Sequence, residues 1–201
     1  NKFEYLNWQE IESIAKEKRS TVIWPFGAVE QHGPHLPLAT DSIFVDDIIS
    51  EVFKLLPADI PLKKLPTQYI GFSPEHKGFA GTISLSSNLI TSMIKEVGGQ
   101  LSEMGFKRLI LINGHGGQIS LLNTAARELR SFSPDMAVFP CFLWSGVNGL
   151  SELLTKTEIE DGLHASLAET SLMLALKPEL VGDERPNEGN KVEIPEGWSL
   201  E

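Results

Sequence analysis

Cysteine is almost absent from this chain, which limits how the chain can be held together. Cys141 is the only cysteine among 201 residues, so no disulfide can form within the chain. A lone thiol suits a reducing compartment, and we expect a cytoplasmic protein. Because Cys141 lies in a strand pattern with no histidine beside it in sequence, we interpret it as a small buried residue rather than a nucleophile.

Long apolar segments are missing as well. No stretch approaches the roughly 20 apolar residues that a membrane-spanning helix needs. The first 19 residues mix lysine, glutamate and tryptophan, and they lack the apolar centre of a signal peptide. We therefore expect no membrane partner.

Positive charge is scarce. The chain has 17 Lys and Arg against 27 Asp and Glu, a formal net charge of −10. Such an acidic chain argues against nucleic acid as a partner and leaves a small molecule as the expected one. Clustered carboxylates can also bind metal ions. The length and a hydrophobic content of 41% suit one globular domain over residues 1–201.

Helical and strand patterns alternate along the chain. Helical spacing covers residues 8–18, 41–56, 87–104, 118–130 and 157–176. Strand patterns cover residues 21–27, 62–70, 82–85, 108–112 and 136–142. This alternation predicts an α/β fold with a mostly parallel central sheet. The polar tail from Gly182 lacks periodicity and is expected to be loop or extended chain.

The first group of chemically active residues follows the strand at 21–27. Glu30 and His32 are two residues apart, so in an extended segment both side chains point the same way and reach one ion. Asp41 opens the next helix, where a carboxylate can bridge two divalent ions. Imidazole with carboxylates suits Zn, Mn, Fe or Co rather than Ca. The alternative is a polar loop in which Asp41 only caps a helix.

The second group is the glycine-rich turn at residues 113–117. His115 lies there at the carboxyl end of the apolar strand 108–112, the edge at which open α/β sheets bind ligands. Gly116 and Gly117 let the backbone come close to a substrate. Alternatively, His115 is a structural histidine. The glycine spacing fits neither the dinucleotide fingerprint nor the Walker pattern.

The third group is His164 and Glu169. Positions five apart on a helix lie about 140° apart, so these two share a pocket only if His164 lies at or before the first turn. Otherwise His164 caps the helix and Glu169 is solvated. His76, in a loop, and Trp144 are candidates for lining a substrate pocket, with surface exposure and core packing as the respective alternatives.

Taken in this order, the three groups resemble the creatininase family of amidohydrolases. The matching stretches are residues 25–38 with Thr40 and Asp41, residues 113–117, His164-Ala165 and residues 169–171, together with Gly81-Thr82. The resemblance runs from about residue 8 to about residue 180. It implies one three-layer α/β/α domain, two divalent metal ions (Zn, Mn or Fe), and assembly as a homo-oligomer, usually a hexamer.

The resemblance also assigns metal ligands. Glu30, Asp41 and His115 would hold one ion, and His32 with the bridging Asp41 would hold the other. Creatininase itself completes the second site with a glutamate two residues after its loop histidine, where this chain has Gly117. Glycine-rich branches of the family use the glutamate of a Glu-Thr-Ser motif, which is Glu169 here.

The resemblance implies hydrolysis of a non-peptide C–N bond, in a cyclic amide or a formamide, by water activated between two metals. His164 and Glu169 are the catalytic candidates, with His164 as general acid to the leaving nitrogen. Creatininase has tyrosine where this chain has Gly116, which argues against creatinine as the substrate. The alternatives are a peptidase of a redox-cofactor pathway and a non-catalytic binding module that retains metals. The family's usual carboxyl-terminal segment is not recognisable after Leu180, so the sequence either stops early or has diverged there.

Overall fold

A four-stranded parallel sheet forms the centre of the computed structural model, which describes residues 1–57, 59–162 and 164–186. In these residues the strand order is β2-β1-β3-β4. The strands are β1 (Thr21–Phe26), β2 (Leu62–Lys64), β3 (Arg108–Asn113) and β4 (Ala137–Phe142). The expected α/β fold with a parallel sheet is confirmed.

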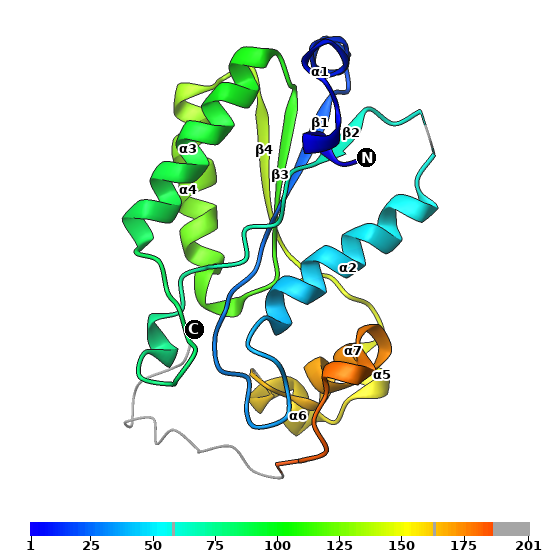
Figure 1. Ribbon diagram of the computed structural model, residues 1–201, viewed down its shortest axis with the longest axis vertical. Coiled ribbons are helices and arrows are strands. Elements are labelled where there is room, and N and C mark those ends of the chain that lie inside the picture. The colour runs from blue at the N-terminus through cyan, green and yellow to red at the C-terminus, as the bar shows by residue number, and fades with distance from the viewer. Residues whose placement is uncertain (58, 163, 187–201) are drawn as a thin grey trace.

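Helices cover both faces of the sheet. Figure 1 shows α3 (Ser87–Met104) and α4 (Ile119–Phe132) on one side and α2 (Thr40–Leu55) on the other. The remaining helices are α1 (Trp8–Ala15), α5 (Leu150–Leu153), α6 (Lys156–Asp161) and α7 (Leu167–Leu176). Short 3-10 segments lie at Phe3–Tyr5, Pro74–His76, Gly116–Gln118 and Pro178–Leu180. In Figure 1, α5, α6 and α7 gather at the end of the molecule where α2 begins.

The central strands are apolar on both faces because both faces are covered. Every residue of β1 is buried. Trp24 and Phe26 belong to the core cluster that includes α3 and α4, whereas Ile23 packs with Val45 and Ile49 of α2. Burying each such side chain contributes roughly 1.5–3 kcal/mol, so the sheet is fixed between its two helical layers.

Two expected strands are shorter or absent. Strand β2 ends at Lys64 instead of reaching residue 70, because Pro66 has no N–H to continue a ladder. The prediction of a strand at 82–85 was wrong, because Ile83 forms only one antiparallel bridge, to Val29. Because it lies outside the sheet, the side chain of Ile83 is 52% exposed.

The helix expected over 157–176 is interrupted, and the interruption positions part of the site. Helix α6 ends at Asp161, with Gly162 as its C-cap residue. Ala165 has a left-handed φ of 50°. Ser166 then caps α7 in a capping box with Glu169. His164 therefore precedes the first turn of α7, which is the condition for it to share a pocket with Glu169.

Cys141 corrects another expectation, because its side chain is exposed rather than buried. It lies on β4, an edge strand of the described sheet. Partial burial still raises the pKa of the Cys141 thiol, which disfavours a reactive thiolate. Within the described ranges, no helix combines the length and apolarity needed to cross a membrane. Most of the polar tail, residues 187–201, lies outside the described residues.

Candidate metal centre

The candidate site lies at the carboxyl ends of β1 and β3, between which the strand order reverses. Glu30 lies in the loop after β1, His115 lies two residues after the end of β3, and Asp41 is in the first turn of α2. Adjacent parallel strands direct their carboxyl ends to one edge of the sheet, which brings these distant segments together.

Glu30, Asp41 and His115 form a first buried group of potential ligands. Nδ1 of His115 lies 3.3 Å from Oε1 of Glu30 and 3.1 Å from Oδ2 of Asp41. Ligands about 2.1 Å from one ion lie roughly 3.0–3.5 Å from each other, so these separations fit donors around a common cation.

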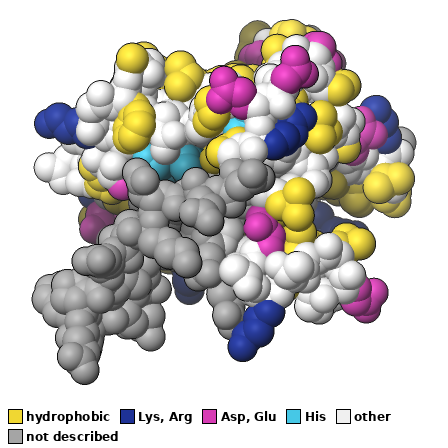
Figure 2. All heavy atoms as spheres, turned by 90° about the horizontal axis from the view of Figure 1, so that it is seen from below, with side chains coloured by type: hydrophobic (Ala, Val, Ile, Leu, Met, Phe, Trp, Pro, Cys, Tyr) yellow, Lys and Arg dark blue, Asp and Glu magenta, His cyan; other side chains and the backbone are white. Residues whose placement is uncertain are grey.

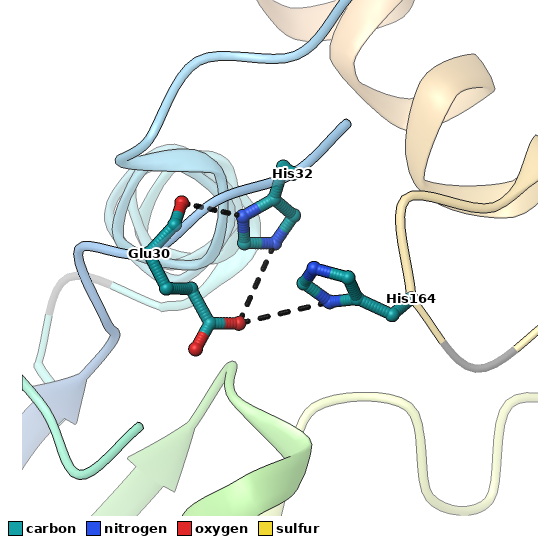
Figure 3. Close-up of side chains that lie close together, drawn as sticks. All are labelled: Glu30, His32 and His164. Atoms are coloured by element: carbon teal, nitrogen blue, oxygen red, sulfur yellow. Dashed lines mark hydrogen bonds and ion pairs between the residues drawn. The ribbon is translucent and has the colours of Figure 1, made fainter. Parts of the chain in front are cut away.

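His32, Asp41 and Glu169 form a second buried group. Nε2 of His32 lies 3.3 Å from Oδ1 of Asp41, the oxygen that does not face His115. Asp41 thus offers one oxygen to each group, as a bridging carboxylate does. Figure 3 shows the side chains of Glu30, His32 and His164 pointing toward one another.

Four buried ligand atoms of these groups have no hydrogen-bond partner. Both carboxylate oxygens of Glu30, Nε2 of His32 and Oδ2 of Asp41 are buried and unpaired. Leaving such atoms unpaired costs free energy that a native fold rarely tolerates. A cation bound between them would satisfy all four atoms, so the donor set fits a metal centre.

Backbone carbonyls fix which nitrogen of each ligand histidine is free. A carbonyl can only accept, so Nδ1 of His32, 3.1 Å from the Glu30 carbonyl, must carry the proton. Nε2 of His115 likewise donates to the carbonyl of Phe72 at 3.0 Å. The unprotonated nitrogens, Nε2 of His32 and Nδ1 of His115, are those that face the carboxylates.

The site concentrates negative charge. Burial alone would lower the pKa of His115, but the carboxylates of Asp41, Glu30 and Glu75 outweigh it and raise that pKa to about 12. Burial would raise the pKa of Asp41, but the imidazoles of His115 and His32 beside it outweigh burial and lower that pKa to about 2. Burial raises the pKa of Glu169 to about 7. The same carboxylates also attract a divalent cation, which would take the place of a second proton on His115.

His164 and His76 lie at the mouth of the site. Their rings stack with centroids 4.3 Å apart, and Nδ1 of His164 lies 3.7 Å from Oε1 of Glu30. The two side chains are 27% and 16% exposed, and Figure 2 shows histidines at the surface on this face of the molecule. The site is therefore open to solvent on the side of these two histidines.

The glycine turn and Trp144 take different positions. A Cβ at Gly116 would meet no atom within 4 Å, which leaves open space beside the turn. Trp144 packs edge-on against Phe44, with ring centroids 5.9 Å apart, in the apolar cluster between α2 and α7. The described ring contact of Trp144 is thus with the core, and its role toward substrate stays a prediction.

Sequence reasoning missed Glu75 and Gln118. Glu75 groups with Glu30 and His76, and the only sequence signal for it was its position next to His76. The buried Gln118 amide donates to the Gly27 carbonyl and to Asn113 Oδ1, both at 3.0 Å. It thereby ties the loop after β1 to the turn after β3, but no local pattern marks a glutamine for that task.

The fold and the site together define an α/β protein with a carboxylate–imidazole metal centre at the carboxyl edge of its sheet. The family model described as creatininase, creatinine amidohydrolase, matches residues 4–199, so the chain belongs to the creatininase family.

Similar proteins include both a peptidase and an amidohydrolase. The mycofactocin precursor peptide peptidase of Mycobacterium tuberculosis is 34% identical over 181 residues, which cover 87% of this chain and 66% of the relative. The chain thus spans just under two thirds of that relative's length. The creatinine amidohydrolase of Pseudomonas putida is 29% identical over 194 residues, covering 90% of this chain and 73% of the relative.

Solved structures of creatininase share the fold. A crystal structure of creatinine amidohydrolase matches with a TM-score of 0.76 and 27% identity, covering 96% of this chain and 81% of that one. The Mn form of creatininase matches with the same TM-score and 26% identity, over the same shares of both chains. Another structure is of a Zn–Zn type, so the family is metal-dependent.

Proposed function

We propose that the protein is a metal-dependent amidohydrolase that cleaves an amide C–N bond with water. The observation that carries the proposal is Asp41, whose two oxygens face different histidines within a set of unpaired buried donors. Glu30, Asp41 and His115 would hold one divalent ion, and His32, Asp41 and Glu169 would hold a second. Zn, Mn or Fe suits these donors.

Two such ions, when bound, supply an activated water and polarise the amide carbonyl. The protein must then move a proton from the attacking water to the leaving nitrogen. His164 is placed for this, because its Nε2 donates to the Gln31 carbonyl at 2.6 Å and leaves Nδ1 unprotonated toward the site. Burial and the neighbouring His32 lower the pKa of His164 to about 4, so it is neutral at pH 7. It takes the proton at Nδ1 and returns it to the leaving nitrogen as general acid.

The glycine turn is proposed to bind the substrate carbonyl. Open space beside Gly116 gives room for a ligand next to the backbone. Backbone N–H groups of Gly116 and Gly117 would stabilise negative charge that develops on the carbonyl oxygen. His76, partly exposed and stacked on His164, lies where it can contact the rest of the substrate.

Two substrate classes are proposed. The first is a non-peptide amide, cyclic or a formamide, as in creatinine amidohydrolase-like chemistry. The second is a peptide, and the observation that favours it is the 34% identity to the mycofactocin precursor peptide peptidase. Turnover of cyclic amides and formamides against short peptides, measured with the metal-loaded protein, separates the two classes.

Elemental analysis tests the proposal directly. We expect about two equivalents of Zn, Mn or Fe in the purified or reconstituted protein, and less in Asp41→Asn and His115→Ala variants that remain folded. Protein that takes up no metal overturns the proposal. Bound metal without turnover of any amide class would instead indicate a binding module.

We further propose that residues 1–201 act as one domain and that the protein works in the cytoplasm as a homo-oligomer, a hexamer by resemblance. The acidic composition and lone cysteine agree with a cytoplasmic protein. Light scattering coupled to gel filtration gives the mass of the assembly, and a monomer at working concentration would contradict the oligomer.

A further inference from the structure

Glu75 brings a carboxylate to the candidate metal centre from a loop distant in sequence. It lies in the 3-10 segment Pro74–His76, and its Oε1 is 3.3 Å from Nε2 of His115. Ligand atoms of Glu75, Glu30 and His76 all lie within 4.8 Å of one another. Glu30 also belongs to the group with Asp41 and His115, so the two groups share a buried carboxylate whose oxygens are unpaired.

The glycine at position 117 makes room for this carboxylate. A Cβ on Gly117 would lie 1.9 Å from Oε1 of Glu75 and 2.6 Å from Nε2 of His115. A side chain at 117 and the observed position of Glu75 therefore exclude each other. Space beside His115 that residue 117 leaves empty is filled by Glu75 instead.

Hydrogen bonding favours Glu75 over its neighbour His76 as a ligand. The Gln31 amide oxygen accepts from Gly33 N–H at 3.0 Å, which fixes the amide so that its Nε2 donates to Nδ1 of His76, also at 3.0 Å. Neutral His76 then carries its proton on Nε2, the nitrogen 3.8 Å from Oε1 of Glu30. A protonated nitrogen has no lone pair for a metal, whereas Glu75 offers two oxygens.

We propose that Glu75 is a metal ligand of this centre and that it supplies, next to Glu30 and His115, the carboxylate that position 117 lacks. The proposal rests on the proposed metal-dependent function. Glu75 shares one potential ligand group with Glu30, and Glu30 also belongs to the group with Asp41 and His115, so Glu75 would approach the ion of that group from the side of Glu30. Compared with creatininase, one glutamate ligand would then come from the loop before Gly81 instead of the glycine turn. The number of carboxylates at the site would be unchanged.

The test compares metal binding in four proteins by elemental analysis and by chelator competition with Co²⁺, read from the Co²⁺ absorption. They are the wild type, Glu75→Gln, the double variant Glu75→Ala/Gly117→Glu, and the control Glu103→Gln on the exposed side of α3. Glutamine keeps an oxygen that can accept from His115, so Glu75→Gln preserves a merely positioning role and removes a ligand carboxylate.

We expect Glu75→Gln to weaken one of the two bound equivalents by more than about 100-fold, beyond what a lost positioning contact usually costs. The double variant should recover part of that affinity, because a Cβ at 117 also lies 2.6 Å from Nε2 of His115 and this ring must shift to admit it. Glu103→Gln should match the wild type. Glu75→Gln with wild-type affinity and an unchanged Co²⁺ spectrum would overturn the proposal, whether or not the double variant folds. Failure of the proposed function is distinguishable, because then the wild type itself binds no metal.

Discussion

At the scale of single residues, Asp41 links the two halves of the site. Its Oδ2 lies 3.1 Å from His115 and its Oδ1 lies 3.3 Å from His32. The position of Asp41 in the first turn of α2 was readable from the sequence, and so was the suitability of its carboxylate for bridging. Which oxygen faces which histidine was not readable, because that depends on how the loop after β1 folds back on the turn after β3.

His164 gives the first prediction. Replacing His164 with alanine should lower kcat by about 10²- to 10⁴-fold with the best substrate found, because the proton relay at Nδ1 is lost. Metal content should stay near that of the wild type, since the two proposed ligand groups do not include His164. Steady-state kinetics and elemental analysis of one sample check both points. A variant that keeps its metals and full turnover would remove His164 from the mechanism.

At the scale of elements, two neighbouring glycines in α3 distinguish packing from helix propensity. A Cβ on Gly98 would lie 2.3 Å from Cδ2 of Leu129 in α4, whereas a Cβ on Gly99 would meet nothing within 4 Å. Helices α3 and α4 therefore approach each other closely at Gly98 and not at Gly99. The sequence predicted the α3 bounds correctly, but its 3.6-residue period did not show which glycine lies at the contact.

We predict opposite effects of alanine at these two positions. Gly98→Ala should lower the free energy of unfolding by about 1–3 kcal/mol, because the added methyl displaces Leu129. Gly99→Ala should raise it by about 0.5–1 kcal/mol through helix propensity alone. Urea denaturation of the two variants measures both. Equal effects of the same sign would show that α3 and α4 do not pack as closely as described.

Asp46 on α2 joins that helix to the sheet edge and gives a pH-dependent prediction. Burial would raise the pKa of Asp46, but hydrogen bonds from Lys64 and Thr67 outweigh it and lower the pKa. A lowered pKa means that the unfolded state binds the proton more readily, so this contribution is present at neutral pH and is lost as pH falls below about 4.

Asp46→Asn should therefore lower stability at pH 7 by about 1 kcal/mol, a figure reduced by the partial exposure of the pair, and should flatten the loss of stability in acid. Lys64→Met should behave similarly, and the double variant should lose little more than either single one. Denaturation curves between pH 3 and pH 7 measure the effect. An unchanged acid dependence in Asp46→Asn would contradict the assignment.

At the scale of the whole molecule, the site is built from segments that the α/β topology brings to one edge of the sheet. Its members come from the loops after β1 and β3, from α2, from the turn before α7 and from α7 itself. Unpaired buried carboxylates weaken the fold when no cation is present, so metal and stability should be coupled.

We expect a chelator to lower the melting temperature of the metal-loaded protein by roughly 5–10 °C, which corresponds to about 2.7 kcal/mol at ligand concentrations of 100 Kd. The shift should vanish in Asp41→Asn, because neither ligand group is then complete. Differential scanning calorimetry with and without chelator provides the measurement. An unchanged melting temperature of the wild type after addition of chelator would show that bound metal does not stabilise the folded state.

The sequence by itself determined the alternating elements and the chemical types and local spacing of the donors, because these depend on short-range periodicity and on side-chain chemistry. It placed Glu30 with His32 on one extended segment and His115 at a strand end, and it made a shared pocket for His164 and Glu169 conditional on where α7 begins. The predictions of a strand at Ile83 and of a buried side chain at Cys141 were wrong, because both depend on which strands are neighbours in the sheet. Only the tertiary structure decided that His164 meets Glu30 and that Glu75 fills the space beside Gly117. Those outcomes depend on contacts between segments about 40 or more residues apart, which no local pattern encodes.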